Sequence, residues 1–211
     1  KLYTLGKQSL TGVFPPKKNI KISKGDLSMV ICSKCKLLQL EHNFDANEMY
    51  GDNYGYMSSL NKSMISHLKI KALGLKKKYL LKNKNNILDI GSNDGTFLSF
   101  FSKNVNLFGC DPTIKKFSHL YRKDIKQLPF FFSSNLFTKN IKFNLITSIS
   151  MFYDLPDPLD FAIQIQKILH DKGIWHIELS YMPMMIKNTS YDTICHEHLE
   201  YYSLKSLKYL L

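Results

Sequence analysis

Apolar and polar residues follow two patterns along this chain: short apolar runs typical of buried strands, and longer stretches with apolar residues at helical spacing. The clearest example covers residues 87–112. Residues 87–90 are apolar with one acid, as expected of a buried parallel strand, and residues 91–95 form a small polar turn. A helix over 96–103 and a second strand over 107–110 follow, so the pattern predicts a strand–helix–strand unit.

The same alternation continues on both sides of this unit. Helices are expected over 58–82, 113–123 and 159–169, and strands over 129–132, 143–150 and 173–179. Repeated units of this kind predict an α/β fold with a parallel, doubly wound sheet, in which ligands bind at the carboxyl ends of the strands. Those ends are expected at 91–95, 111, 133–135, 151–154 and 178–181.

One acid stands directly after the second strand of the first unit. Asp111 follows Gly91 by 20 positions, which is close to the spacing at which such an acid meets a ribose. The turn and the acid together indicate a nucleoside-containing ligand. The alternative is a plain connection between a strand and a helix.

The turn departs from the dinucleotide fingerprint GxGxxG, because Asn93 stands where the second glycine would be. Asp89 and Asp94 would also repel a phosphate. Acids suit a ligand with positive charge and hydroxyl groups, and S-adenosylmethionine (SAM) has a sulfonium, an ammonium and a ribose diol but no phosphate. The turn therefore favours SAM over a dinucleotide.

A second motif lies near the start of the chain. Residues 28–40 have the pattern of strand, tight turn and strand, with Cys32 and Cys35 at the turn. Two thiolates at the tip of a hairpin supply half of a tetrahedral zinc site, so we expect zinc with further ligands upstream of Lys1. His42 is the nearest other ligand. Free thiols or a redox pair are the alternatives, although a redox CxxC usually opens a helix.

The next stretch, residues 44–59, is rich in tyrosine for a linker. Tyr50, Tyr54 and Tyr56 lie among glycine, aspartate and asparagine residues that include Asp52 and Asn53. These tyrosines either line a pocket or pack at a seam between domains, and the sequence does not decide between the two.

Titratable residues are densest after the fifth predicted strand, in residues 192–203. His196, Glu197 and His198 are consecutive there, and tyrosines follow closely. Packing alone does not explain such a cluster beside a predicted ligand site, so it predicts general acid–base chemistry. A metal held by the two histidines is the alternative.

Composition excludes several classes of protein. A net charge of +12 would suit nucleic-acid binding, but Arg122 is the only arginine, whereas base readout and phosphate recognition favour arginine. Hydrophobic residues make up 44% of the chain, which argues for a packed globule rather than disorder. No apolar run reaches membrane-spanning length, and residues 1–10 lack the features of a signal peptide. We expect a cytoplasmic protein that binds neither nucleic acid nor membrane.

Several motifs in one order resemble a known family. They are CxxC followed by Leu-Leu-Gln-Leu, Tyr-Gly-Tyr-Met-Ser, Asp-Ile-Gly-Ser-Asn-Asp-Gly, Gly-Cys-Asp-Pro and Asp-Thr-Ile-Cys-His-Glu-His-Leu-Glu-Tyr-Tyr-Ser. Together they resemble the SAM-dependent sugar C-methyltransferases of deoxysugar pathways, over nearly the whole chain. The resemblance implies a class I, Rossmann-like methyltransferase domain preceded by a small zinc-binding β module with two CxxC pairs and followed by a C-terminal domain. Only the second pair is present here, and we expect the C-terminal domain to lie beyond Leu211.

The resemblance also implies a reaction, methylation at C-3 of a nucleotide-linked 4-keto-6-deoxy sugar, which would be the small-molecule partner. A C–H bond beside a ketone is acidic enough for a base to remove its proton, and the enolate then attacks the sulfonium methyl. His198 would be that base, with Glu197 or a tyrosine of the 54–56 loop orienting it or steadying the enolate. His196 is a reserve candidate. Family members often have an aromatic residue at the position of Cys195.

The predicted SAM contacts follow from position on the sheet edge. Gly91 and Gly95 would let the backbone approach the amino-acid end of SAM, and Asp89 or Asp94 would attract its ammonium. Asp111 would bind the ribose hydroxyls. The full set of predicted contacts is Asp89, Gly91, Ser92, Asn93, Asp94, Gly95, Asp111, Pro112, Ser134 and Asn135, the last two near the adenine.

The predicted organisation has three segments: a partial zinc-binding module with the tyrosine loop over 1–57, the SAM-binding domain over 58–190, and the start of a catalytic domain over 191–211. Two other functions stay open. One is O-methylation of a surface sugar by a SAM-dependent enzyme. The other is nucleic-acid binding by a zinc ribbon on a Rossmann scaffold, without catalysis.

Overall fold

The computed structural model describes residues 1–13, 15, 17–51 and 54–211, and shows two compact units. The first unit comprises residues 1–55, 150–162 and 178–211, and the second comprises residues 56–149 and 163–177. The first and third of the predicted segments therefore lie largely in the same unit. Asp52 and Asn53 of the tyrosine loop lie outside the described residues.

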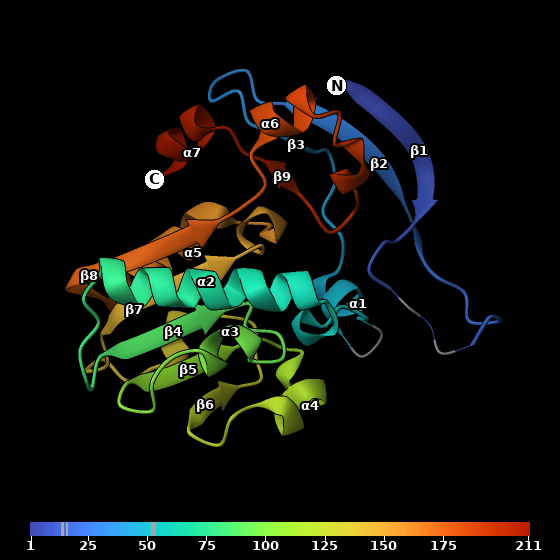
Figure 1. Ribbon diagram of the computed structural model, residues 1–211. Helices are drawn as coiled ribbons and strands as arrows, with labels where there is room; N and C mark the ends of the chain where they lie inside the picture. The colour runs from blue at the N-terminus through green and yellow to red at the C-terminus, as the bar shows by residue number, and fades with distance from the viewer. Residues whose placement is uncertain (14, 16, 52–53) are drawn as a thin grey trace. The chain divides into compact units, whose positions relative to one another are not determined.

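A five-stranded sheet organises the second unit, with the strand order β6-β5-β4-β7-β8 (Figure 1). Its strands are β4 (Asn86–Ile90), β5 (Asn106–Cys110), β6 (Ile125–Leu128), β7 (Phe143–Ile149) and β8 (Leu169–Glu178). β4 is parallel to both β5 and β7, and β5 is parallel to β6. The chain extends the sheet from β4 through β5 to β6 and then returns to add β7 on the other side of β4. The predicted doubly wound α/β fold is therefore confirmed.

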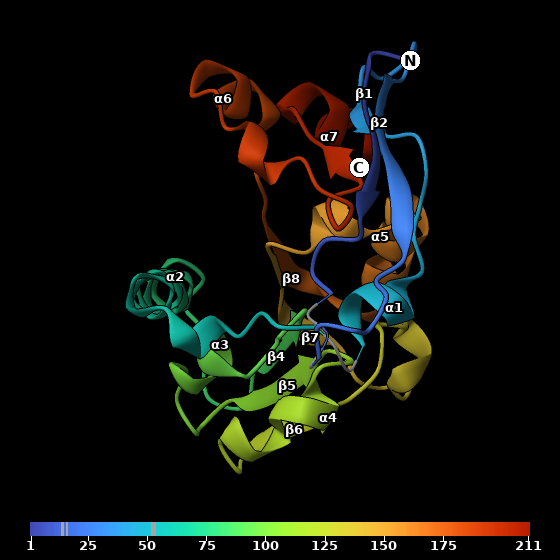
Figure 2. The same ribbon diagram turned by 90° about the vertical axis from the view of Figure 1, so that its right-hand side faces the viewer.

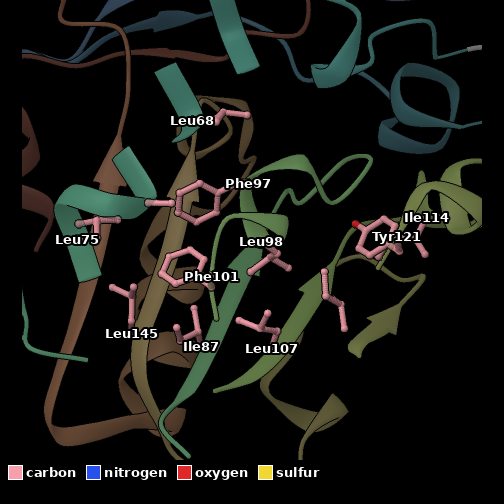
Figure 3. Packing of buried hydrophobic residues seen from close by; sticks show 12 residues of the cluster. Leu68, Leu75, Ile87, Phe97, Leu98, Phe101, Leu107, Ile114, Tyr121 and Leu145 are labelled. Atoms are coloured by element: carbon pink, nitrogen blue, oxygen red, sulfur yellow. The ribbon is translucent and has the colours of Figure 1, made fainter. Parts of the chain in front are cut away.

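Helix α2 (Lys62–Lys78) packs over one face of this sheet (Figure 1). The side chain of Asn61 caps it by accepting a hydrogen bond from the Ser63 N–H, and three lysines in its last turn suit the negative end of the helix dipole. Leu68, Ala72 and Leu75 face inward. Figure 3 shows the resulting core between α2, the short helix α3 (Thr96–Ser99) and strands β4, β5 and β7.

The second unit also differs from the expected pattern at several elements. The third strand lies at Ile125–Leu128 rather than at 129–132, because Pro129 has no N–H to continue the ladder that ends at the Cys110–Leu128 pair. The helix expected over 96–103 is the single turn α3, and that expected over 113–123 is divided into α4 (Ile114–Phe117) and the 3₁₀ turn η2 (Ser118–Leu120). A further 3₁₀ turn, η3 (Ser134–Leu136), follows β6.

The first unit is built on a four-stranded sheet with the order β1-β2-β3-β9. Its strands are β1 (Tyr3–Ser9), β2 (Lys24–Ile31), β3 (Leu38–Leu40) and β9 (Glu200–Tyr201), and each neighbouring pair is antiparallel. Figure 2 shows β1 and β2 side by side. The predicted hairpin around the CxxC is therefore present as β2 and β3, and it is joined by a strand from the far end of the chain.

Five short elements complete the first unit. They are α1 (Ala46–Tyr50), η4 (Phe152–Asp154), α6 (Met182–Lys187), η5 (Tyr191–Thr193) and α7 (Leu204–Leu210). Asp45 caps α1, and a capping box between Ser203 and Ser206 begins α7. An apolar cluster packs on the sheet, with Leu27, Met29, Leu40, Leu199 and Tyr201 at its centre. Helix α5 (Pro158–Ile168) and strand β8 contribute residues to both units.

Among the described residues, no helix is both long enough and apolar enough to cross a membrane.

Candidate cofactor and base sites

The turn after β4 lies in the second unit and has an unusual backbone. Gly91, Asn93 and Gly95 all have positive φ, at 75°, 48° and 77°. Glycine adopts this conformation at little cost, and asparagine tolerates it better than most residues. The Asn93 N–H is 2.9 Å from the Asp111 carboxylate, so the turn is bonded directly to the acid at the end of β5.

Asp111 is the central acceptor of this site and is only 8% exposed. One carboxylate oxygen accepts from Asn93, and the other accepts from the N–H and the hydroxyl of Thr113, at 2.7 and 2.6 Å. Burial raises the pKa of Asp111, while these hydrogen bonds act in the opposite direction. The carboxylate is thus fixed in place at the carboxyl edge of the sheet, where the sequence predicts a ribose contact.

Tyr121 packs against the turn, although no local pattern in the sequence points to it. Its hydroxyl donates to the Asn93 carbonyl at 2.9 Å and lies 2.8 Å from the Ser92 hydroxyl. Its ring fills the space that a side chain at Gly95 would need, since a Cβ there would lie 2.8 Å from the ring. Figure 3 shows Tyr121 at the edge of the core beside Ile114. The tight packing explains why position 95 is glycine.

Asp94 and Asn93 connect the turn to the segment before α2. Asp94 accepts from the Ser59 N–H at 2.7 Å and from the Thr96 N–H at 3.1 Å. The Asn93 side chain accepts from the Ser58 N–H at 2.9 Å and donates to the Tyr56 carbonyl at 3.2 Å. Tyr56 therefore binds the turn through its backbone, and its side chain is 45% exposed.

Asp89 is in the interior of the sheet, on β4, and is 3% exposed. Its carboxyl accepts from the Thr147 hydroxyl at 2.6 Å. Burial raises its pKa to about 7, and the charge of Asp111 contributes in the same direction. This burial makes Asp94, in the turn itself, the better placed of the two acids that were predicted to attract an ammonium group.

The remaining predicted cofactor residues follow β5 and β6. Pro112 is half-buried between Asp111 and Thr113. Ser134 donates through its N–H to the Gln164 side chain at 2.9 Å, and Asn135 is exposed on the turn η3. These contacts do not test whether Ser134 and Asn135 lie beside the adenine, so that assignment stays a prediction.

The charges around the turn favour a cation. The charge of Asp94 raises the pKa of Asp111, and the charge of Asp111 raises the pKa of Asp89. Each carboxylate thus makes it harder for its neighbour to ionise. A ligand with a sulfonium and an ammonium would relieve this repulsion, whereas a pyrophosphate would add to it. The residues present therefore fit SAM.

The histidine segment lies in the first unit and forms a second site. The ring Nδ1 of His198 is 2.7 Å from the Thr193 carbonyl oxygen, so the N–H at Nδ1 donates to that oxygen. In the neutral imidazole this hydrogen bond leaves Nε2 as the acceptor. The ring also packs edge-on against Tyr153, with 4.6 Å between centroids. This orientation leaves Nε2 as the ring atom of His198 that can accept a proton.

Glu197 lies against the N-terminal segment of the chain. The Thr11 side chain hydrogen-bonds its carboxylate, and Gly12, which has a φ of 79°, leaves room for it because a Cβ there would overlap the carboxylate. Burial raises the pKa of Glu197, while the charge of His198 lowers it. The carboxylate is thus electrostatically coupled to the imidazole next to it in sequence.

His196 has a different environment and is 1% exposed. Its Nε2 is 3.2 Å from the Gly25 carbonyl, and its ring meets Phe44 edge-on at 4.8 Å. Its backbone N–H donates to Thr11 at 3.0 Å. These contacts give His196 a structural position, which separates it from the more accessible His198.

Two of the predicted tyrosines lie in different units. Tyr54 belongs to the first unit, where its ring contacts Tyr50 at 5.4 Å and its backbone bridges Val13. Tyr56 belongs to the second unit. Cys195, at the position where the resembled family often has an aromatic residue, is partly buried, and this burial raises the pKa of its thiol.

Tyr50 and Asp154 also join the histidine site, although the sequence did not single them out as catalytic. The Tyr50 hydroxyl is 3.3 Å from the Glu197 carbonyl and hydrogen-bonds the Asp154 carboxyl. The Leu199 N–H donates to the Tyr153 carbonyl at 2.8 Å, which holds the η4 turn against the histidine segment. These residues come from three distant parts of the chain, so no local pattern could have grouped them.

The CxxC motif lies in the tight turn between β2 and β3 and brings two cysteines into it. The Cys32 N–H bonds the Leu37 carbonyl at 2.9 Å, and Lys36 has a φ of 62°. Backbone hydrogen bonds from Cys35 and Lys34 lower the pKa of Cys32, which favours the thiolate that binds zinc. The described residues bring together no group of three or more metal ligands, so Cys32 and Cys35 as two of the four ligands of a structural zinc stay a prediction.

Comparison with protein families identifies the chain. Residues 64–211 match the family model described as "Methyltransferase domain". The chain belongs to this methyltransferase family. Residues 1–50 match a second model, described as "Putative zinc binding domain", which covers the hairpin with Cys32 and Cys35. The predicted Rossmann-like methyltransferase fold and the predicted methyltransferase family are confirmed.

Known relatives agree with this assignment. The C-methyltransferase NovU of Streptomyces niveus is 26% identical over 186 residues, which are 86% of this chain and 44% of NovU. The chain thus spans less than half the length of this curated relative. Among solved structures, the plantazolicin methyltransferase BpumL, in complex with a desmethylPZN analogue and SAH, has a TM-score of 0.55 at 17% identity, over 70% of this chain and 61% of BpumL. YcgJ from Bacillus subtilis has a TM-score of 0.56 at 17% identity, over 67% of this chain and 66% of YcgJ.

The burial of Asp89 predicts a dependence of stability on pH. Asp89 has a pKa of about 7 in the folded protein and ionises near 3.8 when exposed, so its contribution to stability is complete below pH 3.8 and is lost as the pH rises through 7. The substitution Asp89→Asn keeps the acceptor for Thr147 but removes the ionisation. The free energy of unfolding of the variant, relative to the wild type, should increase by up to ~4 kcal/mol between acidic and mildly alkaline pH.

Urea unfolding of both proteins across this pH range measures the difference. Asp171→Asn, an exposed position in the same unit, serves as the control and should show little pH-dependent difference. If the difference in unfolding free energy between Asp89→Asn and the wild type does not change with pH, Asp89 is ionised in the folded protein over this pH range.

Proposed function

We propose that this chain contains the SAM-binding and base-bearing parts of a C-methyltransferase. Its substrate would be a nucleotide-linked 4-keto-6-deoxy sugar, methylated at C-3. The observation that carries the proposal is the orientation of His198, whose Nδ1–H donates to the Thr193 carbonyl and leaves Nε2 to accept a proton. The name of NovU as a C-methyltransferase and the resemblance of the sequence motifs support the same reaction class.

Carbon methylation needs a base, because a C–H bond must lose its proton before the carbon can act as a nucleophile. SAM, when bound, would supply an electrophilic methyl group on its sulfonium. His198 would remove the proton of the carbon next to the ketone, and Glu197, whose charge interacts with His198, would stabilise the imidazolium that forms. A hydroxyl group as the methyl acceptor would not require a ketone beside it.

Each of the proposed cofactor residues would contact a different part of SAM. Asp111 would accept hydrogen bonds from the ribose hydroxyls, and Asp94 would face the cationic amino-acid end. The backbone of the turn at Gly91 and Gly95 would allow close approach. Tyr121 would hold the turn in the conformation that makes this possible, through its bonds to Ser92 and Asn93.

The proposed role of Asp111 predicts a loss of SAM affinity on substitution. Asp111→Asn removes the charge that two ribose hydroxyls would meet, and hydrogen bonds to charged groups are worth about 1.5–3 kcal/mol each. The dissociation constant for SAM should rise at least about tenfold, as measured by isothermal calorimetry. Asp171→Asn should bind SAM like the wild type. If Asp111→Asn retains its melting temperature and binds SAM normally, Asp111 does not contact the ribose.

The proposed base predicts a proton-exchange reaction that does not need SAM. In deuterated water, the wild type should exchange the C-3 hydrogen of a 4-keto-6-deoxyhexose linked to dTDP, GDP or CDP, with the preferred nucleotide found from this panel. His198→Ala should exchange about 10²–10⁴-fold more slowly, because general base catalysis contributes rate factors of this size. Nuclear magnetic resonance of the sugar measures the exchange.

His42→Ala is a matched control, since His42 is an exposed histidine in the same unit. It should exchange at the wild-type rate, and both variants should bind SAM normally. Absence of exchange by a wild type that binds SAM would count against carbon methylation and favour methyl transfer to a hydroxyl group.

A further inference from the structure

A small pocket in the first unit adjoins the histidine segment. Its volume is about 30 Å³, which accommodates one water-sized group but not a sugar ring. Its lining combines apolar side chains, among them Phe44, Met49 and Leu199, with the titratable side chains of Tyr50, Asp154 and Glu197. The pocket therefore suits a single polar atom of a ligand.

Asp154 carries an oxygen atom in this region that lacks a partner. Its Oδ1 is fully buried and has no hydrogen bond to any of the described residues, whereas Tyr50 bonds the same carboxyl group. A buried polar atom without a partner costs about 1–3 kcal/mol, so proteins retain such atoms where they serve a purpose. Asp154 is also held firmly, because its N–H donates to the Met151 carbonyl at 3.0 Å within η4.

In their neutral forms Asp154 and Tyr50 are hydrogen-bond donors, and burial favours these forms by raising the pKa of each group. Burial raises the pKa of Asp154 well above its usual range, and the nearby charge of Glu197 acts in the same direction. Burial, together with the charge of Asp154, likewise raises the pKa of Tyr50. A phenol and a neutral carboxylic acid beside an apolar wall are a pair that can stabilise an enolate oxygen.

The proposed base lies next to this pair. Tyr153, which precedes Asp154, packs its ring against His198, and the Leu199 N–H bonds the Tyr153 carbonyl. His198 is also the strongest charge that lowers the pKa of Asp154. The donors and the base therefore belong to one packed group within the first unit.

We propose that Tyr50 and Asp154 form a binding site for the carbonyl oxygen of the substrate and hold it while it becomes an enolate oxygen. This inference rests on the proposed function. His198 Nε2 takes the proton, the electron pair of the C–H bond forms the C=C bond, and the π pair of the carbonyl moves to oxygen. When the carbon attacks the methyl group, the oxygen pair returns and the carbonyl forms again. When the substrate oxygen binds, the Tyr50 O–H turns to it from the Glu197 carbonyl and the Asp154 carboxyl, protonated Asp154 donates from Oδ1, and neither group loses a proton.

The test is the rate of C-3 deuterium exchange, without SAM, on the keto sugar nucleotide that the wild type prefers. Asp154→Ala and Tyr50→Phe should each lower the rate about 10²–10³-fold, which is the effect of removing one donor to a developing oxyanion. Asp154→Asn keeps a donor in its amide group and should lose much less, about tenfold. Asp26→Ala and Tyr209→Phe, exposed positions in the same unit, are the controls and should match the wild type.

Each other result has a distinct meaning. Equal losses in Asp154→Asn and Asp154→Ala would overturn the proposal, because Asp154 would then act as a charged carboxylate toward His198. Wild-type rates in Asp154→Ala and Tyr50→Phe would also overturn it, and the pocket would hold only water. If His198→Ala abolishes exchange in that case, the proposed function stands and only this inference fails. If the wild type binds SAM but exchanges no keto sugar, both fail.

Melting temperatures separate these outcomes from misfolding. Asp154→Ala removes a buried oxygen that has no partner together with the hydrogen bond to Tyr50, and its melting temperature shows whether the variant folds. If that variant does not fold, Tyr50→Phe, which keeps the ring and removes only the hydroxyl, carries the test with the same expected loss and the same contradicting result.

Discussion

The pairing of the two-residue strand β9 with β3 is the constraint on which the histidine site depends. Leu38 pairs with Tyr201 and Gln39 with Glu200, while the Leu40 N–H bonds the Leu199 carbonyl at 2.8 Å. These bonds fix the end of the segment that contains His196, Glu197 and His198. They join it to the hairpin with the two cysteines, so the region that matches the zinc-binding model also supports the candidate base. The stability of that hairpin is therefore linked to the geometry of the histidines.

Charge distribution distinguishes the two candidate sites. Around the glycine turn, the charge of Asp94 raises the pKa of Asp111 and the charge of Asp111 raises the pKa of Asp89, which suits a cationic ligand. Around the histidine segment, Glu197 is coupled to an imidazole that can become cationic. In both places a positive charge would stabilise a carboxylate. In the proposed reaction, SAM supplies it at the first site and the protonated base supplies it at the second.

Local patterns in the sequence predicted the strand–turn–helix–strand unit and the acid at its end, because the spacing of apolar residues and of Asp111 reflects neighbours along the chain. The third strand was misplaced because Phe130, Phe131 and Phe132 have high strand propensity, but Pro129 ends the ladder before them. The contacts that support the two candidate sites could not be predicted from the sequence, for another reason. Tyr121 packs against Gly95, Thr11 bonds Glu197, and Tyr50 bonds Asp154 only in the folded chain. The members of each pair are too far apart in the sequence for a short motif to predict their contact.

The central claim is that the methyl group is transferred to carbon, and the position of the methyl group in the product tests it most directly. The protein would be incubated with ¹³C-methyl SAM and the keto sugar nucleotide that it binds, and the product would be examined by ¹H–¹³C correlation spectroscopy. The proposed function predicts that the labelled methyl is attached to C-3, which then carries one hydrogen fewer than in the substrate. A labelled methyl attached to oxygen would contradict it.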